Sequence, residues 1–552
     1  MFGNTRTRRE RGSLVVTVML FTAAVLLVLL PVLGFLHHMQ VVTLRRRAGE
    51  MAFYAAESGT ARALSFIQAQ SQGIHNGMFD VPKANALYPF GNDANGQEVD
   101  VNRTDADLAN VDDFASYKVK IYMETVGGTK RHYVESTGRS TLAPQNLFRR
   151  VTVEILPTPF SQYAFFNTTS LSAMDGRPRW LVAGEQFWGP VHSNRFLFVT
   201  GASGNPLIFH SDVTMVRGEV GGGNVIYEGL KDTNADYVEL PGDLTGLKNA
   251  AASGGIQLPE DDPYYNPNED SDPTNDVPVP PPVFYGDPIH NYEFSFDNQT
   301  VAITNLFSGT SFTRSISPGS FNGAVVVNKG NVFVHGAVDG AVTIAATGTR
   351  VATPTPYTQA SNGNVIVNGE LKYAGHPADQ QYVENPDMGN CDDVVGLIAE
   401  RNFALDADCP SNAIVDAHIM VTGQATENPR VDQGEWASAG PNDTVSAAVG
   451  QDGAFFIEDG VQLDLSRIWS GGYDDSTGQD SGGWKAGDLY LTGGVVHFMR
   501  GQTGNSAGGY RRHYAFDTRL HSMPPPYYPL TGDTTIVTWR ETRHAGGASF
   551  DF

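Results

Sequence analysis

An uninterrupted apolar segment close to the N-terminus constrains this chain more than any other feature. Between Ser13 and Leu36 the sequence has no charged side chain, and the arginine-rich stretches RTRRERG and RRR flank the longer apolar run. At 1.5 Å per residue, a helix of this length measures roughly 30–36 Å, enough to cross a hydrocarbon core. A secretory signal is shorter and ends in a small-residue cleavage site, which LGFLHHMQ lacks. We therefore expect a retained transmembrane helix at 13–36 that carries the rest of the chain out of the cytoplasm.

Two further motifs accompany this segment. A short basic leader ends in Gly12, the apolar helix begins at Ser13, and AFYAAESGTARAL follows at Ala52–Leu64. Together they resemble the type IV pilin-like proteins with a PilX-type N-terminus. In that family a prepilin peptidase cuts after the glycine, and the mature helix packs into a filament core.

The resemblance implies a leader at 1–12, processing between Gly12 and Ser13, and a pilin helix over 13–73. Major pilins carry Glu as the fifth mature residue, whereas Thr17 occupies that place here. This departure argues against a major subunit. A plain signal anchor with a basic N-terminus is the alternative interpretation.

Length and charge set limits on the rest of the chain. With 552 residues, the chain exceeds one ordinary core, so two or more domains are expected. The net charge is −23, and removing a leader of four arginines and one glutamate (net +3) would leave −26. A protein this acidic repels nucleic acid at long range, so any DNA contact needs a local basic patch.

The remaining pattern predicts an α+β chain that is mostly β-structure. Three alternating or β-branched segments at 117–126, 131–142 and 147–156 predict a small antiparallel, pilin-like sheet within 74–159. From 160 to 529, short strands recur between Gly and Asn turns, which favours a β-solenoid-type head inserted into the pilin fold; a sandwich or several small sheets are alternatives. The stretch 259–288 is acidic and Pro-rich and predicts a loop. The last segment, 530–552, contains an apolar strand predicted to return to the small sheet.

The head carries a second resemblance. The phrases GPVHSN, VGLIAERN, LTGGVV and GY…HYAFDTRLHSMPPPYYP resemble an exported family of large, β-rich, pilus-linked proteins of unassigned chemistry. The order of segments is also similar to competence-associated minor pilins whose sheet carries an inserted β-solenoid head. That resemblance implies a pilus-tip position and contact with incoming DNA.

The late part of the head is rich in basic and aromatic residues. Arginines neutralise phosphates, and aromatic side chains stack on bases. The candidate contacts for double-stranded DNA are Arg500, Arg511, Arg512, Arg519, Arg540 and Arg543. The alternative is that these arginines pair with nearby carboxylates and pin the C-terminal segment to the head.

One acidic loop has the spacing of a calcium site. Oxygen ligands at the first, third, fifth and twelfth places are how an EF-type loop wraps Ca²⁺. The residues at these places are Asp232, Asn234, Asp236 and Asp243. Tyr237 stands where that loop needs glycine, and the same spacing also occurs in plain Asx turns, so both interpretations remain open.

The chain has two cysteines, Cys391 and Cys409. In an exported body they would form one disulfide worth about 3 kcal/mol, with two free thiols as the alternative. For catalysis, His192 and Ser193 are the one tempting pair, but neighbouring residues on a strand point to opposite faces. We therefore expect no enzyme and no cofactor apart from the calcium hypothesis.

The sequence thus predicts a minor pilin-like or pseudopilin-like subunit with a single membrane pass in the inner membrane, later at the pilus or cell surface. Its expected partners are other pilins, the inner membrane, prepilin peptidase and double-stranded DNA taken up in natural transformation. The alternatives are a structural or adhesive surface protein anchored by its N-terminal helix, and a β-helix carbohydrate-active enzyme.

Overall fold

The chain divides into two compact units. Unit 1 comprises Met1–Pro157 with Thr534–Phe552, and unit 2 comprises Thr158–Asp533. The computed structural model describes residues 7–69, 81–88, 99–100, 115–126, 129–142, 147–171, 178–242, 244–263, 290–306, 308–317, 319–348, 362–383, 385–389, 391–406, 409–423, 455–457, 487–501, 504–505, 508–521 and 523–543. Most of the predicted loop 259–288 lies outside these ranges.

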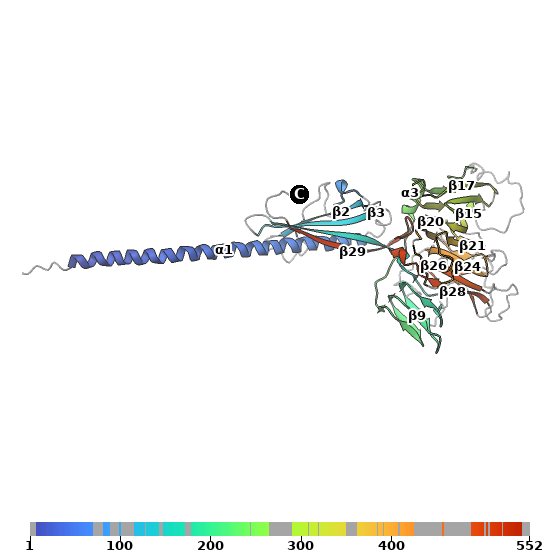
Figure 1. Cartoon of the computed structure of the whole chain (residues 1–552), viewed down its shortest axis with the longest axis horizontal. Coiled ribbons are helices and arrows are strands. Elements are labelled where there is room, and N and C mark those ends of the chain that lie inside the picture. The colour runs from blue at the N-terminus through green and yellow to red at the C-terminus, as the bar shows by residue number, and fades with distance from the viewer. Residues whose placement is uncertain are drawn as a thin grey trace, which may run out of the picture. The chain divides into compact units, whose positions relative to one another are not determined.

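Unit 1 begins with one long helix, α1 (Thr7–Ala69), drawn in blue in Figure 1. Its apolar side chains between Leu14 and Leu44 are exposed. Within the described residues, α1 is the helix long and apolar enough to cross a membrane. The helix continues through Pro31, where the sequence predicts a kink or a local loss of helix.

A five-stranded sheet completes unit 1, in the order β1-β2-β3-β4-β29. The strands β2 and β3 and the strands β3 and β4 are antiparallel. The bounds are β1 (Val99–Asp100), β2 (Ala115–Val126), β3 (Thr129–Ser140), β4 (Leu147–Pro159) and β29 (Leu530–Arg543). A short 3₁₀ helix, η1 (Lys83–Asn85), precedes β1. The last strand of the chain is therefore the neighbour of β4.

Small residues bring the second half of α1 close to this sheet. Ala52 and Ala56 are fully buried, and a Cβ added to Gly138 of β3 would lie 1.9 Å from the carbonyl oxygen of Ala52. A Cβ on Gly59 would lie 2.4 Å from the hydroxyl of Ser136. Backbone can approach backbone this closely only where no side chain intervenes. The small-residue face of the helix thus packs on the chain's own sheet.

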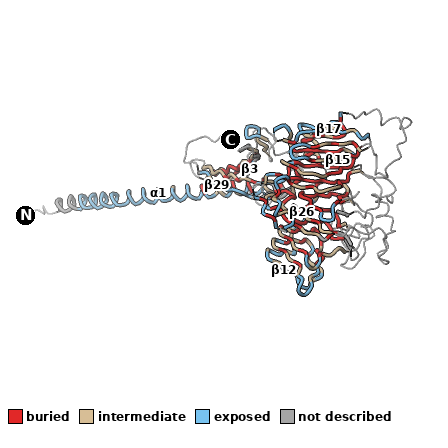
Figure 2. The backbone as a smooth tube through the Cα atoms, turned by 45° about the vertical axis from the view of Figure 1, so that its right-hand side comes forward, coloured by how far each residue is buried: buried red, intermediate tan, exposed pale blue. Residues whose placement is uncertain are grey.

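Unit 2 is built mainly from parallel ladders. The first ladder joins β14 (Ile256–Leu258), β18 (Ala324–Val327), β20 (Ala341–Ala346), β22 (Val394–Ala399), β24 (Asn412–Val421), β26 (Gly487–His497), β5 (Phe165–Asn167), β7 (Val191–Ser193), β10 (Val213–Met215) and β13 (Lys231–Asp232). The second joins β15 (Asn291–Asn298), β19 (Asn331–Val338), β21 (Val365–Tyr373), β23 (Phe403–Leu405) and β25 (Phe455–Ile457). Figure 2 shows buried residues concentrated along these strands.

Smaller pieces complete the unit. Parallel pairs join β6 (Gln186–Phe187), β9 (Leu207–Phe209) and β12 (Val225–Tyr227), and β8 (Phe196–Thr200) with β11 (Gly218–Gly222). β28 (Gly508–Ala515) pairs in parallel with β26, while β16 (Thr300–Asn305), β17 (Ser311–Ser315) and β27 (Gly504–Asn505) make antiparallel pairs. Among the described residues of unit 2, the helices are α3 (Thr245–Ala252), η3 (Phe160–Gln162) and η7 (Thr518–His521).

The parallel register explains why several strands are apolar without alternation. Val325, Ile344 and Leu397 are successive partners in the first ladder and lie in one large core. Their neighbours Val326, Ala345 and Ile398 point to the opposite face and are buried in a second core. Helix α3 and Tyr528 belong to that second core as well. Strands covered on both faces read as continuous apolar runs, as in VVGLIA.

The structure confirms an α+β chain with a long N-terminal apolar helix and a large sheet-rich body. Two local expectations are wrong. Asn328 and Asn368 follow short strands, so the sequence predicts a left-handed turn residue at each. Lys329 has the positive φ, 52°, in place of its neighbour Asn328, and Asn368 is not left-handed.

Candidate functional site

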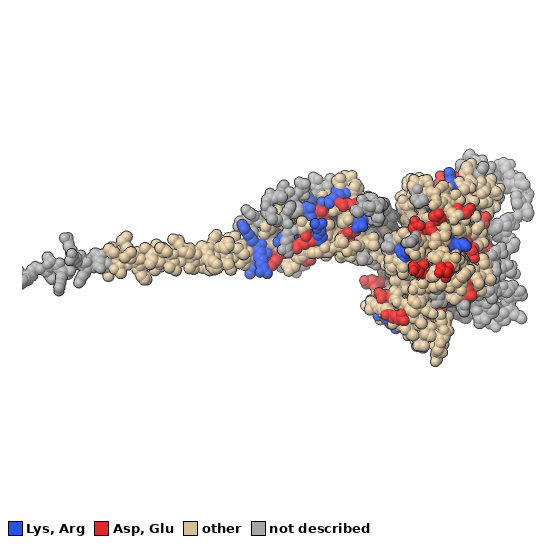
Figure 3. Space-filling view, viewed as in Figure 1, with Lys and Arg blue, Asp and Glu red and all other residues tan. Residues whose placement is uncertain are grey.

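Basic side chains gather at one end of unit 1, which we call the basic end. It comprises Arg45, Arg46 and Arg47 on α1, Arg149 on β4 and Arg540 on β29. Figure 3 shows blue side chains crowding where the bare part of α1 meets the sheet. A Cβ on Gly49 would lie 3.1 Å from a guanidinium nitrogen of Arg149, so α1 passes the start of β4 two residues after Arg47.

Contacts between β4 and β29 place Glu541 at the same end on the α1 side, while alternation along the strand turns its neighbour Arg540 to the opposite face of the sheet. Arg149 Nε lies 3.7 Å from a carboxylate oxygen of Glu541, and Thr538 Oγ1 donates to Glu154 at 3.3 Å. The start of β4 therefore lies beside the end of β29.

The arginines of the basic end are mostly open to solvent. Arg46 pairs with Glu50 at 3.1 Å, with its side chain 83% exposed. Arg45, Arg47 and Arg540 are exposed as well, and within the described residues none of the three forms an ion pair. Exposed guanidinium groups of this kind are available to phosphate or carboxylate ligands.

Three of the predicted DNA contacts of unit 2, Arg500, Arg512 and Arg519, are largely buried instead. Arg500 is 4% exposed, donates to the backbone oxygen of Arg179 at 2.7 Å and lies over the ring of Phe165. Burial, with the nearby Arg512 guanidinium, lowers the pKa of Arg500 to about 10. Arg512 binds the carboxylate of Glu185, whose side chain is 8% exposed. Burial opposes the charge of Arg512, but Glu185 and Tyr514 outweigh it and raise its pKa.

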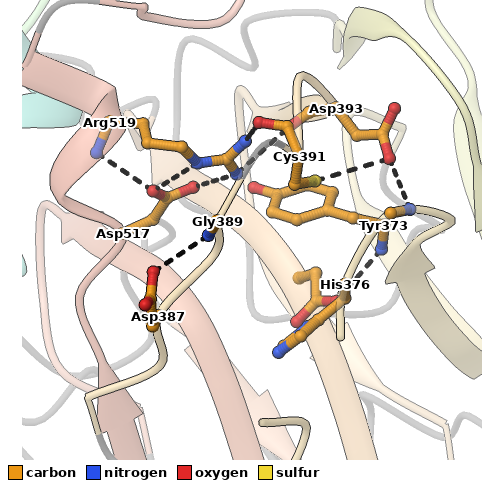
Figure 4. A network of polar contacts seen from close by, with 10 residues as sticks. Tyr373, His376, Asp387, Gly389, Cys391, Asp393, Asp517 and Arg519 are labelled. Carbon is orange, nitrogen blue, oxygen red and sulfur yellow. Dashed lines mark hydrogen bonds and ion pairs between the residues drawn. The ribbon is translucent and has the colours of Figure 1, made fainter. Parts of the chain in front are cut away.

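Arg519 is the centre of a buried polar network, drawn in Figure 4. Its Nε and Nη2 donate to the two carboxylate oxygens of Asp517 at 2.9 and 2.6 Å. It also donates to the backbone oxygens of Cys391 and Asp393, and its guanidinium lies over the ring of Tyr373. Asp517 raises the pKa of Arg519 against the opposing effect of burial. These contacts fix the segment after β28 to the strands β21 and β22.

Two further carboxylates extend this network. Asp393 accepts from the backbone N–H of Gly340 and of Gly375, each at 2.7 Å. Asp416, which is fully buried, accepts from the backbone N–H of Tyr373 at 3.0 Å and lies 2.6 Å from Nδ1 of His376. Burial works against the charge of His376, but the Asp416 carboxylate outweighs it and raises the pKa of His376. The arrangement is that of a structural clamp.

The predicted set of arginines is therefore not one exposed stripe. Inside unit 2, Arg519 pairs with the nearby carboxylate of Asp517, Arg512 with the distant carboxylate of Glu185, and Arg500 with a backbone oxygen. Arg540 belongs to unit 1, and so does Arg543, the last residue of β29. The side chains of Arg511 and Arg543 lie outside the described residues.

The calcium hypothesis gains no ligand group from the structure. Asp232 ends β13, and its carboxylate accepts from the backbone N–H of Asn234 at 2.9 Å, which is an Asx turn. Asp243 lies outside the described residues. Within the described residues, no three His, Cys, Asp or Glu side chains are placed to hold a metal ion.

The expected disulfide is not formed, because both cysteines are free thiols. Cys409 is buried and donates to the backbone oxygen of Val367 at 3.0 Å, whereas a Cβ on Gly375 would meet the sulfur of Cys391 at 3.1 Å. Cys409 contacts β21 at Val367 and Gly369, whereas Cys391 lies beside Gly375, beyond the end of that strand. Each strand residue advances about 3.3 Å, and a disulfide needs Cα atoms within roughly 7 Å. Burial raises the pKa of Cys391 to about 11.

His192 and Ser193 also have separate partners. The ring of His192 contacts Thr214 at 2.7 Å and Asn194 at 2.9 Å, while the Ser193 hydroxyl donates to Asn167 at 2.6 Å. Burial lowers the pKa of His192 to about 4. The two side chains do not form a nucleophile and base.

Comparisons with known proteins leave the family open. No family model matches the sequence, and no curated protein matches it. Among solved structures, the chain is similar to the competence-associated pilin ComZ from Thermus thermophilus. The two are 13% identical, the match covers 90% of this chain and 98% of that one, and the TM-score is 0.27. A likeness at this TM-score carries no argument about fold or function.

The arginines that follow the apolar helix can be seen in the sequence, but the basic end as a surface cannot. The signal was present in the distribution of charge. The segments of unit 1 hold 19 Lys and Arg against 16 Asp and Glu, net +3, whereas unit 2 holds 18 against 44, net −26. Only the strand order shows that Arg149 and Arg540 join Arg45–Arg47.

Proposed function

We propose that the chain is a minor type IV pilin-like subunit, anchored by α1 in the inner membrane and later in a filament. One observation carries this proposal. A single helix has an exposed apolar first part and a second part whose small residues pack on an antiparallel sheet completed by the C-terminal strand. This is the ground plan that the sequence resemblance implies for a pilin.

Maturation at the leader is part of the proposal. Prepilin peptidase would cut between Gly12 and Ser13 and release the basic leader. The test is the intact mass of the chain after co-expression with a prepilin peptidase, for the native sequence and for Gly12→Val. We expect loss of residues 1–12 from the native chain and from the control Gly3→Val, and no cleavage of Gly12→Val. A native chain that keeps its leader would identify a plain signal anchor and overturn this proposal.

The head is proposed to be of the β-solenoid type and to stand at the pilus tip. Parallel ladders in register, with buried columns of apolar residues, support the first part. The size of unit 2, Thr158–Asp533, supports the second, since so large a body would clash if repeated along a helical filament. Other pilins are the proposed partners. Immunogold labelling of filaments tests the position, with label at filament ends expected and label along the shafts contradicting it.

Binding of double-stranded DNA in natural transformation stays a prediction. Its test is a mobility shift of duplex DNA with the full chain at low salt, repeated at rising salt, because phosphate contacts weaken steeply with salt. Arg540→Gln is the informative variant, since Arg540 is exposed. Lys329→Asn is the control, because Lys329 is an exposed cation of unit 2 outside the set of candidate DNA contacts. No shift at low salt would contradict DNA binding and leave the pilin proposal standing.

The function proposed is binding or assembly, without turnover. A structural or adhesive surface protein remains the runner-up and shares the anchor. It predicts loss of attachment on deletion and an uncut leader.

A further inference from the structure

The charged residues that flank the apolar part of α1, Arg11 and Arg45, are separated by about the thickness of a membrane. Between Arg11 and Arg45 the sequence has no Lys, Arg, Asp or Glu. These 34 steps span about 51 Å of helix, and about 46 Å along the membrane normal at a tilt near 25°. A bilayer with its headgroup layers is about 40–45 Å thick. With Arg11 in one headgroup layer, Arg45–Arg47 lie in the other.

The three arginines surround the helix at that level. Consecutive residues of an α-helix are turned by about 100°, so Arg45, Arg46 and Arg47 point in three different directions. Val42 and Leu44, within the turn that precedes them, are 47% and 38% exposed, so the apolar surface continues up to the arginines. Arg540 of β29 is exposed at the same end of unit 1, on the face of the sheet opposite α1. The exposed apolar part of α1 is thus followed directly by cations that spread over more than half of its circumference.

The charge rule that orients transmembrane helices does not explain why three arginines stand at 45–47. Lys and Arg flanking a transmembrane helix favour the cytoplasmic side. The leader has four arginines, and Arg45–Arg47 place three on the exported side, which opposes the orientation that the leader favours. Removal of the leader would leave Arg45–Arg47 as the basic residues of α1 before Arg62.

We propose that the basic end binds the phosphate groups of anionic phospholipids in the leaflet where α1 leaves the membrane. Guanidinium groups make charge-assisted, often bidentate hydrogen bonds with phosphate oxygens. The contact fixes the depth of α1 and holds the sheet of unit 1 at the headgroup layer before the subunit enters a filament. This inference rests on the proposed function, because it requires α1 to cross the membrane.

The test measures lipid preference in the full-length chain. The protein is reconstituted in phosphatidylcholine vesicles that contain spin-labelled phosphatidylglycerol or spin-labelled phosphatidylcholine, and the motionally restricted fraction of each lipid is compared. The variant is Arg45→Gln with Arg47→Gln, two exposed arginines of the basic end that form no ion pair with the described residues. The control is Arg314→Gln with Lys329→Asn, which removes the same charge from exposed positions of unit 2.

We expect the native chain and the control to prefer phosphatidylglycerol, and the variant to lose most of that preference. A basic residue near an anionic surface changes association by up to about fivefold, so a loss of several-fold is expected at low salt. Equal preferences in all three proteins, or an equal loss in the control, would overturn the inference. Flotation of the vesicles separates the two proposals: a native chain that floats without lipid preference contradicts only the inference, and one that does not float contradicts the anchor as well.

Discussion

Units 1 and 2 hold nearly equal numbers of basic residues, 19 and 18, but use them in opposite ways. In unit 1, Arg45, Arg47 and Arg540 are exposed, while in unit 2 Arg500, Arg512 and Arg519 are taken up by buried carboxylates and backbone oxygens. Packing differs as well, because unit 1 relies on Gly and Ala contacts between helix and sheet, and unit 2 on stacked Val, Ile and Phe. The number of arginines in a segment therefore says little about the binding surface that it offers.

The largest effect is expected from breaking the buried Arg519–Asp517 pair of unit 2. Asp517→Ala leaves Arg519 without its carboxylate, and removing one partner of a buried pair costs about 3–5 kcal/mol. Hydrogen exchange of the full-length chain in rising urea reports the free energy of unfolding of each unit separately. Protection should fall in unit 2 and stay unchanged in unit 1. Asp379→Ala, at an exposed carboxylate, is the control, and an equal effect of both variants would contradict the internal role of Arg519.

A second variant acts on unit 1 alone. Gly138→Ala places a Cβ 1.9 Å from the carbonyl oxygen of Ala52, so α1 must move away from β3, at a cost of roughly 3 kcal/mol. Exchange of the amides in β2 and β3 should rise while the ladders of unit 2 stay protected. Gly34→Ala is the matched control, because nothing lies within 4 Å of its Cβ. Unchanged protection in Gly138→Ala would mean that helix and sheet are not held by this contact.

Low pH should also weaken unit 2. Burial lowers the pKa of His418 to about 4, as it does for His192, while an unfolded histidine titrates near 6.5. The unfolded state therefore binds more protons between these values, and stability present above pH 6.5 is lost as the pH falls towards 4. The loss is about 3 kcal/mol for His418, and His418→Gln should reduce the pH dependence by that amount.

His376 has the opposite sign in the same pH titration. Its raised pKa adds stability below pH 6.5, and that stability is lost as the pH rises through the folded value. Urea midpoints at pH 4, 5, 6 and 7 for the native chain and for His418→Gln measure how the opposing effects of His418 and His376 on stability combine. Parallel curves would contradict a neutral buried His418.

The smallest effect belongs to the exposed pair of the basic end. Arg46→Gln removes the contact with Glu50, whose side chain is 53% exposed, and should change the stability of unit 1 by less than about 0.5 kcal/mol. Thermal unfolding monitored by circular dichroism checks this. A larger loss would show that the basic end is needed for folding and would remove the contrast with Arg519.

The sequence predicted the features that depend on neighbouring residues. The apolar run from Ser13 gives a membrane-length helix in α1, and the short strands from Phe160 onward give a sheet-rich body. Periodicity and turn residues act over a few positions and can be read directly from a sequence.

Features that depend on distant partners could not be predicted. Arg512 meets Glu185 across 327 residues, so a binding arginine and a buried one look alike in the sequence. The same limit explains the wrong disulfide prediction, because the distance between Cys391 and Cys409 depends on where their segments pass β21 in the ladder. An Asx turn at Asp232 and a calcium loop share the same spacing, so the pattern alone does not separate them.

The position of β29 next to β4 has a consequence for export. In the proposed topology α1 stays in the membrane and the chain after it is exported in sequence order, so four strands of the small sheet arrive before the head and the fifth, β29, arrives last. Until then the edge of β4 is unpaired, and an unpaired edge recruits other chains. Premature termination anywhere in the head would leave that edge open on a membrane-tethered fragment. The small sheet can therefore be completed only after the whole head has been exported.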